Sequence, residues 1–135
     1  MPRFLLAVIF LVTELSLVYL GPAVAAERRT VKSGQEVVLQ AYYRYRRRDC
    51  KSMKVVVKIV KSGDHGRVRE GVGHHDPYYA KATDAWGARC TGIKIRSHVF
   101  YYRAKKGFRG TDHVILRPVG FMAGGRNEHF YITVE

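Results

Sequence analysis

The residues best able to do chemistry are cations gathered in one short stretch of the chain. Between positions 41 and 61 there are eight Lys or Arg residues and a single acid, Asp49. Closely spaced like charges repel one another unless an anion lies among them, so the stretch indicates a polyanion-binding face. The alternative is a solvated face that aids solubility and protects strand edges. The candidate anion-binding residues are Arg44, Arg46, Arg47, Arg48, Lys54 and Lys58.

The overall charge indicates the same class of partner. The chain has 24 Lys and Arg against 11 Asp and Glu, which gives a formal net charge of +13. Such a charge on a short chain predicts attraction to an anionic polymer, a lipid headgroup or an acidic protein. The sequence lacks the patterns of nucleic-acid-binding modules, so nucleic acid is not the expected partner.

A second set of candidate residues lies between positions 69 and 89, where the hydrophobic pattern is irregular. If this segment is a loop, His74 and His75 could converge on zinc or copper, which makes a small metal-handling protein one alternative function. Alternatively, the segment could be a partner loop that recognises an acidic protein, as in an inhibitor or adhesion module, through His74, His75, Tyr78 and Tyr79. Loops carry such residues for solvation alone, so we assign neither a metal nor a cofactor.

Motifs of enzymes are missing from the sequence. It contains no Gly-x-Ser-x-Gly elbow, no glycine-rich phosphate loop and no paired histidines at helical spacing. Acidic residues are few and scattered, which disfavours the carboxylate pair of a glycosidase. We therefore predict a binding or structural module with no catalytic residue.

The N-terminal segment is typical of an export signal. Arg3 precedes an apolar run from Phe4 to Leu20, and small residues at positions 23–26 suit a signal peptidase. An uncleaved membrane anchor is the alternative, but an ionised Glu14 in the middle of the run would be costly there. We predict a signal-peptide helix over residues 1–26, cut after Ala25 or Ala26. The mature protein is then one domain, 27–135, secreted or periplasmic, with no transmembrane span.

Both cysteines, Cys50 and Cys90, follow this segment. In an oxidising compartment two cysteines form one disulfide by default, and neither has a second cysteine close by at metal-ligand spacing. We expect the bridge to tie the basic stretch to the far end of the irregular region.

Apolar residues of the mature chain alternate with a period of two, which is typical of half-buried strands. The alternation predicts strands near 37–46, 53–60, 113–117 and 129–134, with Tyr42 pointing outward. If the first two are neighbours in one sheet, Arg44, Arg46, Lys54 and Lys58 share a face. The segment 92–103 has two parities, which a bulge near Ser97 and His98 would reconcile. The expected core residues are Leu39, Ala41, Tyr43, Val55, Val57, Ile59, Val68, Phe100, Tyr102, Val114, Leu116, Phe130 and Ile132.

Several landmarks also follow a familiar order. His65-Gly66-Arg67-Val68 is followed by "VFYYRAKKGFRGTDHVIL" from Val99 to Leu116, and the last strand ends in "YITVE". This order resembles bacterial Ig-like (cadherin-like) domains, above all the single-domain secreted type of uncharacterised function with one disulfide. The resemblance implies an all-β, Ig-like β-sandwich of about seven strands, and a fold implies no chemistry. Calcium is not carried over from cadherins, because the chain has no acidic runs.

The most specific part of this resemblance is the corner from Gly107 to Asp112. Gly107 and Gly110 permit positive φ angles in a tight connection, and Phe108 can close the end of the sandwich. Asp112 can accept hydrogen bonds from backbone donors in the turn.

Overall fold

The computed structural model describes residues 26–77, 90–120 and 125–135, and all of the helix or strand structure within them is strand. The predicted all-β class is therefore confirmed. The predicted signal-peptide helix falls almost entirely in residues 1–25, outside the described part. The longer strands are β1 (Glu27–Val31), β2 (Glu36–Tyr42), β5 (Val56–Lys61), β6 (Gly66–His75), β7 (Ile95–Ala104), β8 (Gly110–Val119) and β9 (Glu128–Val134).

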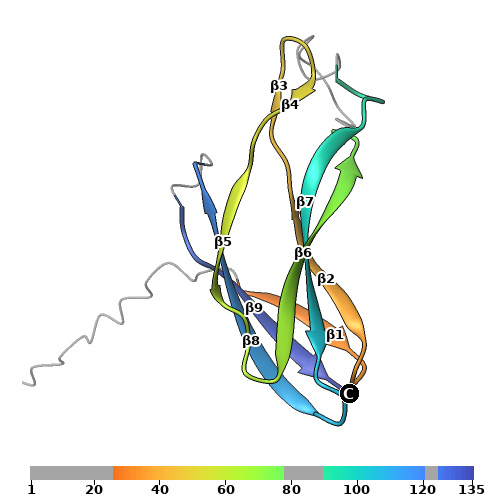
Figure 1. Ribbon diagram of the computed structural model, residues 1–135, viewed down its shortest axis with the longest axis vertical. Helices are drawn as coiled ribbons and strands as arrows, with labels where there is room; N and C mark the ends of the chain where they lie inside the picture. The colour runs from red at the N-terminus through yellow and green to blue at the C-terminus, as the bar shows by residue number, and fades with distance from the viewer. Residues whose placement is uncertain (1–25, 78–89, 121–124) are drawn as a thin grey trace, which may run out of the picture.

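Two sheets hold these seven strands. The first has the order β1-β9-β8-β5 and the second has the order β2-β7-β6. β1 runs parallel to β9, and the other pairs are antiparallel. A short hairpin of β3 (Tyr45–Arg46) and β4 (Lys51–Ser52) lies at the end of the molecule opposite the C-terminus (Figure 1).

The main hydrophobic core is built from both sheets. Phe100 and Tyr102 of β7 pack in one cluster with Leu116 of β8 and Phe130 of β9, and all four are at most 1% exposed. Fully burying a large apolar side chain contributes about 1.5–3 kcal/mol, so this cluster is what holds the sheets together. The other predicted core residues that are buried here are Leu39, Val55, Val114 and Ile132, with Val57 and Val68 packed at the margin.

A bulge in β2 and the edge position of β5 change which residues face the core. The register of β2 against β7 shifts between Val38 and Gln40, so both Leu39 and Tyr42 are buried. The prediction that Tyr42 points outward is therefore wrong. A bulge inserts one residue, which reverses the alternation beyond it. In β5 the register shifts only after Ile59, which still pairs with buried Leu116. Ile59 is nevertheless 44% exposed instead of buried, because β5 is an edge strand of its sheet.

The bulge expected in the 92–103 segment is absent. The pairing of β6 with β7 runs without interruption through Ser97 and His98. Two parities occur because β7 is the central strand of its sheet and is covered on both faces. Ser97 and Val99 are buried on one face, and Phe100 and Tyr102 are buried on the other.

Part of the region predicted to be irregular is a strand. β6 continues to His75 and pairs with β7 over its whole length. Gly71 and Gly73 weaken the strand pattern in the sequence, because glycine has no side chain to alternate. The structure requires glycine at position 73, since a Cβ there would lie 2.8 Å from a methyl group of Val99.

The predicted disulfide joins Cys50 to Cys90, whose Cα atoms are 5.5 Å apart. Both cysteines are buried with Ile95, and Tyr43 and Tyr45 pack against this second cluster. Tyr43 therefore belongs to this cluster and not to the main core. The bridge fastens the β3–β4 hairpin to the turn that leads into β7.

A buried polar network holds the β5–β6 turn against the core. Asp112 is 3% exposed and accepts a hydrogen bond of 2.6 Å from the Tyr102 hydroxyl. It also accepts bonds of 2.8 Å from the backbone amides of Asp64 and His65. The prediction that Asp112 accepts backbone hydrogen bonds is confirmed, although these two donors come from a different turn. A Cβ on Gly66 would lie 2.3 Å from the Tyr102 ring, so glycine must follow His65.

The 107–112 corner also has the predicted backbone. Gly107 has a φ of 87° and Gly110 a φ of 135°. Phe108 packs against the main core and stacks on His65 with ring centroids 3.9 Å apart.

Candidate anion-binding site

The structure separates the predicted basic face into two parts. β2 pairs with β7 in one sheet, whereas β5 pairs with β8 in the other. The condition under which Arg44, Arg46, Lys54 and Lys58 would share one face, that the two strands are neighbours in one sheet, is therefore not met. The reason is that the β3–β4 hairpin carries the chain from one sheet to the other.

Two of the predicted cations have partners within the protein. Arg46 donates to Asp49 with N–O distances of 2.8 and 2.5 Å. The hydrogen bond from Arg46 lowers the pKa of Asp49 to about 2. Arg44 donates to the backbone carbonyl of Gly120 at 3.3 Å. These two arginines stabilise the hairpin and its surroundings.

Three other cations of the hairpin are exposed: Arg47, Arg48 and Lys51. Within the described ranges, their side chains form no hydrogen bond or ion pair. The loop that carries Arg47 and Arg48 is fixed, because the amides of Asp49 and Cys50 both donate to the carbonyl of Arg46. The hairpin therefore presents these charges to solvent from a defined backbone.

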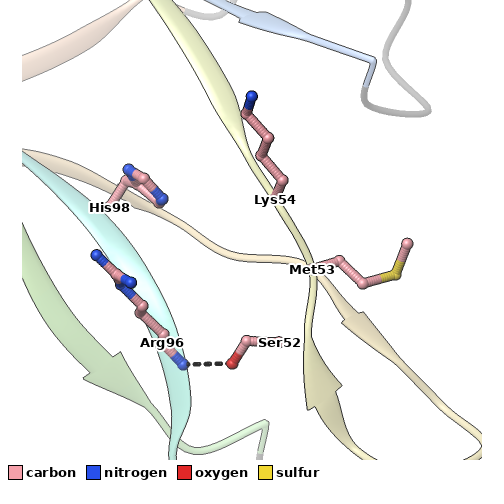
Figure 2. Close-up of a pocket in the computed structure, with 5 residues that line it drawn as sticks. All are labelled: Ser52, Met53, Lys54, Arg96 and His98. Atoms are coloured by element: carbon pink, nitrogen blue, oxygen red, sulfur yellow. Dashed lines mark hydrogen bonds between the residues drawn. The ribbon is translucent and has the colours of Figure 1, made fainter.

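A pocket of about 310 Å³ opens beside the hairpin. Its walls are the segment 52–54 and the strand β7 (Figure 2). The Ser52 hydroxyl accepts a hydrogen bond of 2.9 Å from the backbone N–H of Arg96, which sets the spacing of the two walls. The residues that line the pocket are Ser52, Met53, Lys54, Arg96 and His98.

The pocket is positively charged. Figure 2 shows Arg96 and His98 along one side of β7, as their spacing of two requires, with Lys54 on the facing wall. Lys54 and Arg96 are exposed, and no carboxylate is among the lining residues. Glu70 of the neighbouring β6 is bound to Nδ1 of His98 and not to either of the two longer cations. The arrangement can offer at least two strong donors to an anion.

Sequence reasoning found Lys54 and missed Arg96 and His98. Both side chains alternate with buried Ile95 and Ser97, which is the ordinary pattern of a strand. The expected bulge near Ser97 and His98 concealed that pattern. No local signal places Arg96 in one pocket with Lys54, because the pocket depends on the packing of distant segments.

His74 and His75 do not converge. They are adjacent in β6, and adjacent strand residues point to opposite faces of the sheet. The ring of His75 stacks on Tyr43 with centroids 4.0 Å apart. In the part of the chain that the structure describes, no three His, Cys, Asp or Glu residues gather where they could hold a metal ion. The proposed loop residues Tyr78 and Tyr79 lie outside that part.

A different histidine pair lies on the outer face of the four-stranded sheet. Nε2 of His113 and Nδ1 of His129 are 3.0 Å apart, and the His113 ring also stacks on Tyr131. Burial lowers the pKa of His113, and repulsion from His129 and Lys61 lowers it further. The sequence gives no sign of this pair, because the two residues meet only through the pairing of β8 with β9.

A second cavity of about 550 Å³ lies near the C-terminal end of β7. It too is lined by cations, namely Arg67, Arg103, Lys105 and Lys106. Acidic side chains offset their charge, however: Asp64 lines the cavity, and Glu36 lies 3.6 Å from Arg103. Asp64 and Glu36 are also bound to Lys61 and Arg69, so this cavity is a second candidate for an anion.

Within residues 26–77, 90–120 and 125–135 there is no helix long and apolar enough to cross a membrane. The chain matches no family model, no curated protein and no solved structure.

Proposed function

We propose that this protein is an exported binding module that holds an anionic polymer at the pocket between residues 52–54 and β7. One observation carries the proposal: Lys54 and Arg96 line the same concave pocket, and no carboxylate lines it with them. Charged hydrogen bonds from two such cations stabilise an anion more than either would alone. The excess of positive charge on the whole chain adds a long-range attraction.

The neighbouring hairpin favours a polymer over a single small anion. Arg47, Arg48 and Lys51 are exposed beside the pocket on a loop that the disulfide fastens. A polymer with repeated negative charges can occupy the pocket with one group and reach the hairpin with the next. A flat membrane surface would meet the hairpin but would not fill a recess of about 310 Å³.

The same proposal includes that the protein is exported, that it has an Ig-like fold and that it acts by binding and not by catalysis. The N-terminal pattern and the disulfide support an oxidising, extracytoplasmic location. The strand orders β2-β7-β6 and β5-β8-β9 support the Ig-like assignment, since they follow the two sheets of an Ig-type sandwich. We assign no catalytic residue.

Binding to heparin at several salt concentrations tests the proposal. We expect the wild-type protein to bind, with affinity that falls steeply as salt rises. The double variant Lys54→Glu, Arg96→Glu should bind at least about tenfold more weakly, because a charged hydrogen bond contributes about 1.5–3 kcal/mol.

The matched control is Arg28→Glu, Arg109→Glu, which changes the net charge equally at two exposed sites far from the pocket. This control should lose much less affinity. Circular dichroism of both variants checks that they are folded. Equal losses in the two variants would mean that binding depends on overall charge, and the proposed site would be wrong.

A further inference from the structure

The second cavity, of about 550 Å³, gathers positive charge between two neighbouring strands. Arg67 of β6 and Arg103 of β7 both line it, and they are directly opposite each other in the register of the two strands. Like charges in this position repel one another and destabilise the pairing unless an anion lies among them. Lys105 and Lys106, which follow β7, add two more exposed cations to the same lining.

The acids near this cavity leave much of its charge uncompensated. Glu36 binds Arg69 at N–O distances of 2.9 and 2.5 Å, and its carboxylate lies farther, at 3.6 Å, from Arg103. Among the described residues that line the cavity, Asp64 is the one acid, and it is paired with a lysine outside the lining. Within the described ranges, the side chain of Arg67 forms no hydrogen bond or ion pair. The cavity therefore keeps an excess of positive charge.

Hydrogen bonds between three turns hold the walls of this cavity in place. The backbone N–H of Lys105 donates to the carbonyl of His65 at 2.8 Å. The backbone N–H of Gly107 donates to the Ser33 hydroxyl at 2.8 Å. The turns before β2 and β6 are thereby tied to the turn after β7. The cations of the cavity, like those of the hairpin, are carried by a defined backbone.

The two cation-lined recesses lie toward opposite ends of β7, which runs from the hairpin end of the molecule toward the C-terminus (Figure 1). The spacing from Arg96 to Arg103 corresponds to about 23 Å along a strand. Because successive strand residues alternate, Arg96 shares the core-facing side of β7 with Phe100, whereas Arg103 is on the other side of the sheet. A polymer segment in one recess would have to cross the edge of the sheet to enter the other.

We propose that the second cavity is a further binding site for the anionic polymer, and that the protein uses its two recesses to join two polymer chains. This inference rests on the proposed function, since the first chain occupies the pocket between residues 52–54 and β7. It adds a second site and an activity, the cross-linking of chains. The first recess fills at lower polymer concentration, because Arg47, Arg48 and Lys51 of the hairpin add to its charge.

Calorimetric titration of residues 27–135 with a heparin tetrasaccharide counts the sites, because this ligand is shorter than the distance between the recesses. We expect the wild-type protein to bind two tetrasaccharides in two steps of different affinity. The first-pocket variant Lys54→Glu, Arg96→Glu should lose the tighter step and retain the weaker one.

Two second-cavity variants should do the reverse. Arg67→Glu, Arg103→Glu should retain the tighter step and weaken the other by about tenfold or more, since a charged hydrogen bond contributes about 1.5–3 kcal/mol. Lys105→Glu, Lys106→Glu removes charge from the same cavity without altering the paired strands, and it should have the same effect. Circular dichroism checks that each variant is folded.

Light scattering with long heparin chains measures cross-linking. The wild-type protein should form large particles at comparable numbers of protein and polymer sites, and the particles should shrink when either component is in excess. The first-pocket variant and both second-cavity variants should bind heparin and form no such particles. The charge-matched control is Arg28→Glu, Arg126→Glu, at two exposed positions that line neither recess, and it should cross-link as the wild type does.

The outcomes separate this inference from the proposed function. A single tetrasaccharide per wild-type molecule, or cross-linking that persists in both second-cavity variants, would overturn the second site. Loss of cross-linking in the charge-matched control would mean that it depends on net charge alone, and would overturn the joining of chains by two sites. The proposed function fails on a different result, namely that the first-pocket variant retains the tighter step.

Discussion

Asp112 is the residue on which most of the buried polar structure depends. Burial alone would raise the pKa of this carboxyl, but hydrogen bonds from Tyr102 and from the amides of Asp64, His65 and His113 outweigh burial and lower it. The carboxylate is thus held in its charged form by four donors at the edge of the core. Asp112 therefore joins the 107–112 corner to the turn at Asp64 and His65, which is a larger role than a hydrogen bond within its own turn.

Replacing Asp112 with Asn should destabilise the fold by about 2–3 kcal/mol, because an amide NH₂ would face backbone donors that then lose their acceptor. Urea denaturation at neutral pH measures the change in the free energy of unfolding. The matched control is Asp64→Asn, which removes an exposed carboxylate and should cost less than about 1 kcal/mol. An equal cost in both variants would contradict the role of the network.

His113 predicts a dependence of stability on pH. Its pKa in the folded protein is below the ordinary histidine value of 6.5, so the unfolded chain binds the proton more readily. Stability from the neutral ring is therefore present above that value and is lost as pH falls below it. Unfolding measured between about pH 8 and pH 5 should show this loss, and His113→Gln should reduce it. An unchanged pH profile in the variant would refute the assignment.

At the scale of elements, the alternation of apolar residues predicts most strands but not the bulges within them. It places Val114, Leu116, Phe130 and Ile132 in the core, where each of them is found. It fails at Tyr42, because the bulge in β2 depends on the partner strand and leaves no mark in the local pattern. It fails at Ile59 because β5 is an edge strand, which the local pattern does not show. Glycines likewise concealed the second half of β6.

The disulfide belongs to the same scale, since it fixes one element to another. Replacing both Cys50 and Cys90 with Ala should lower stability by about 4 kcal/mol in the chain-entropy model. It should also weaken heparin binding, because the hairpin that carries Arg47 and Arg48 would lose its attachment to the turn before β7. Thermal unfolding and heparin affinity measure the two effects. An unchanged melting temperature would contradict a stabilising bridge.

At the scale of the whole molecule, the sandwich determines which charges act together. Composition alone indicates a polyanion partner, and the basic stretch alone indicates Lys54 and the exposed arginines of the hairpin. The pocket that Lys54 lines together with Arg96 and His98 was beyond prediction, because these residues are far apart in sequence and the pocket forms only when the segment 52–54 lies beside β7. Similarly, the sequence pattern does not show that Arg46 donates hydrogen bonds to Asp49, or that Arg44 donates one to the carbonyl of Gly120.

Chemical-shift mapping of isotopically labelled residues 27–135 with a short heparin oligosaccharide tests the central claim most directly. The account predicts that the largest amide and side-chain shifts occur at residues 52–54 and 96–98, with smaller ones at Arg47, Arg48 and Lys51. The shifts should diminish as salt rises. The largest shifts at Arg67, Arg103, Lys105 and Lys106, or shifts spread evenly over all exposed cations, would contradict it.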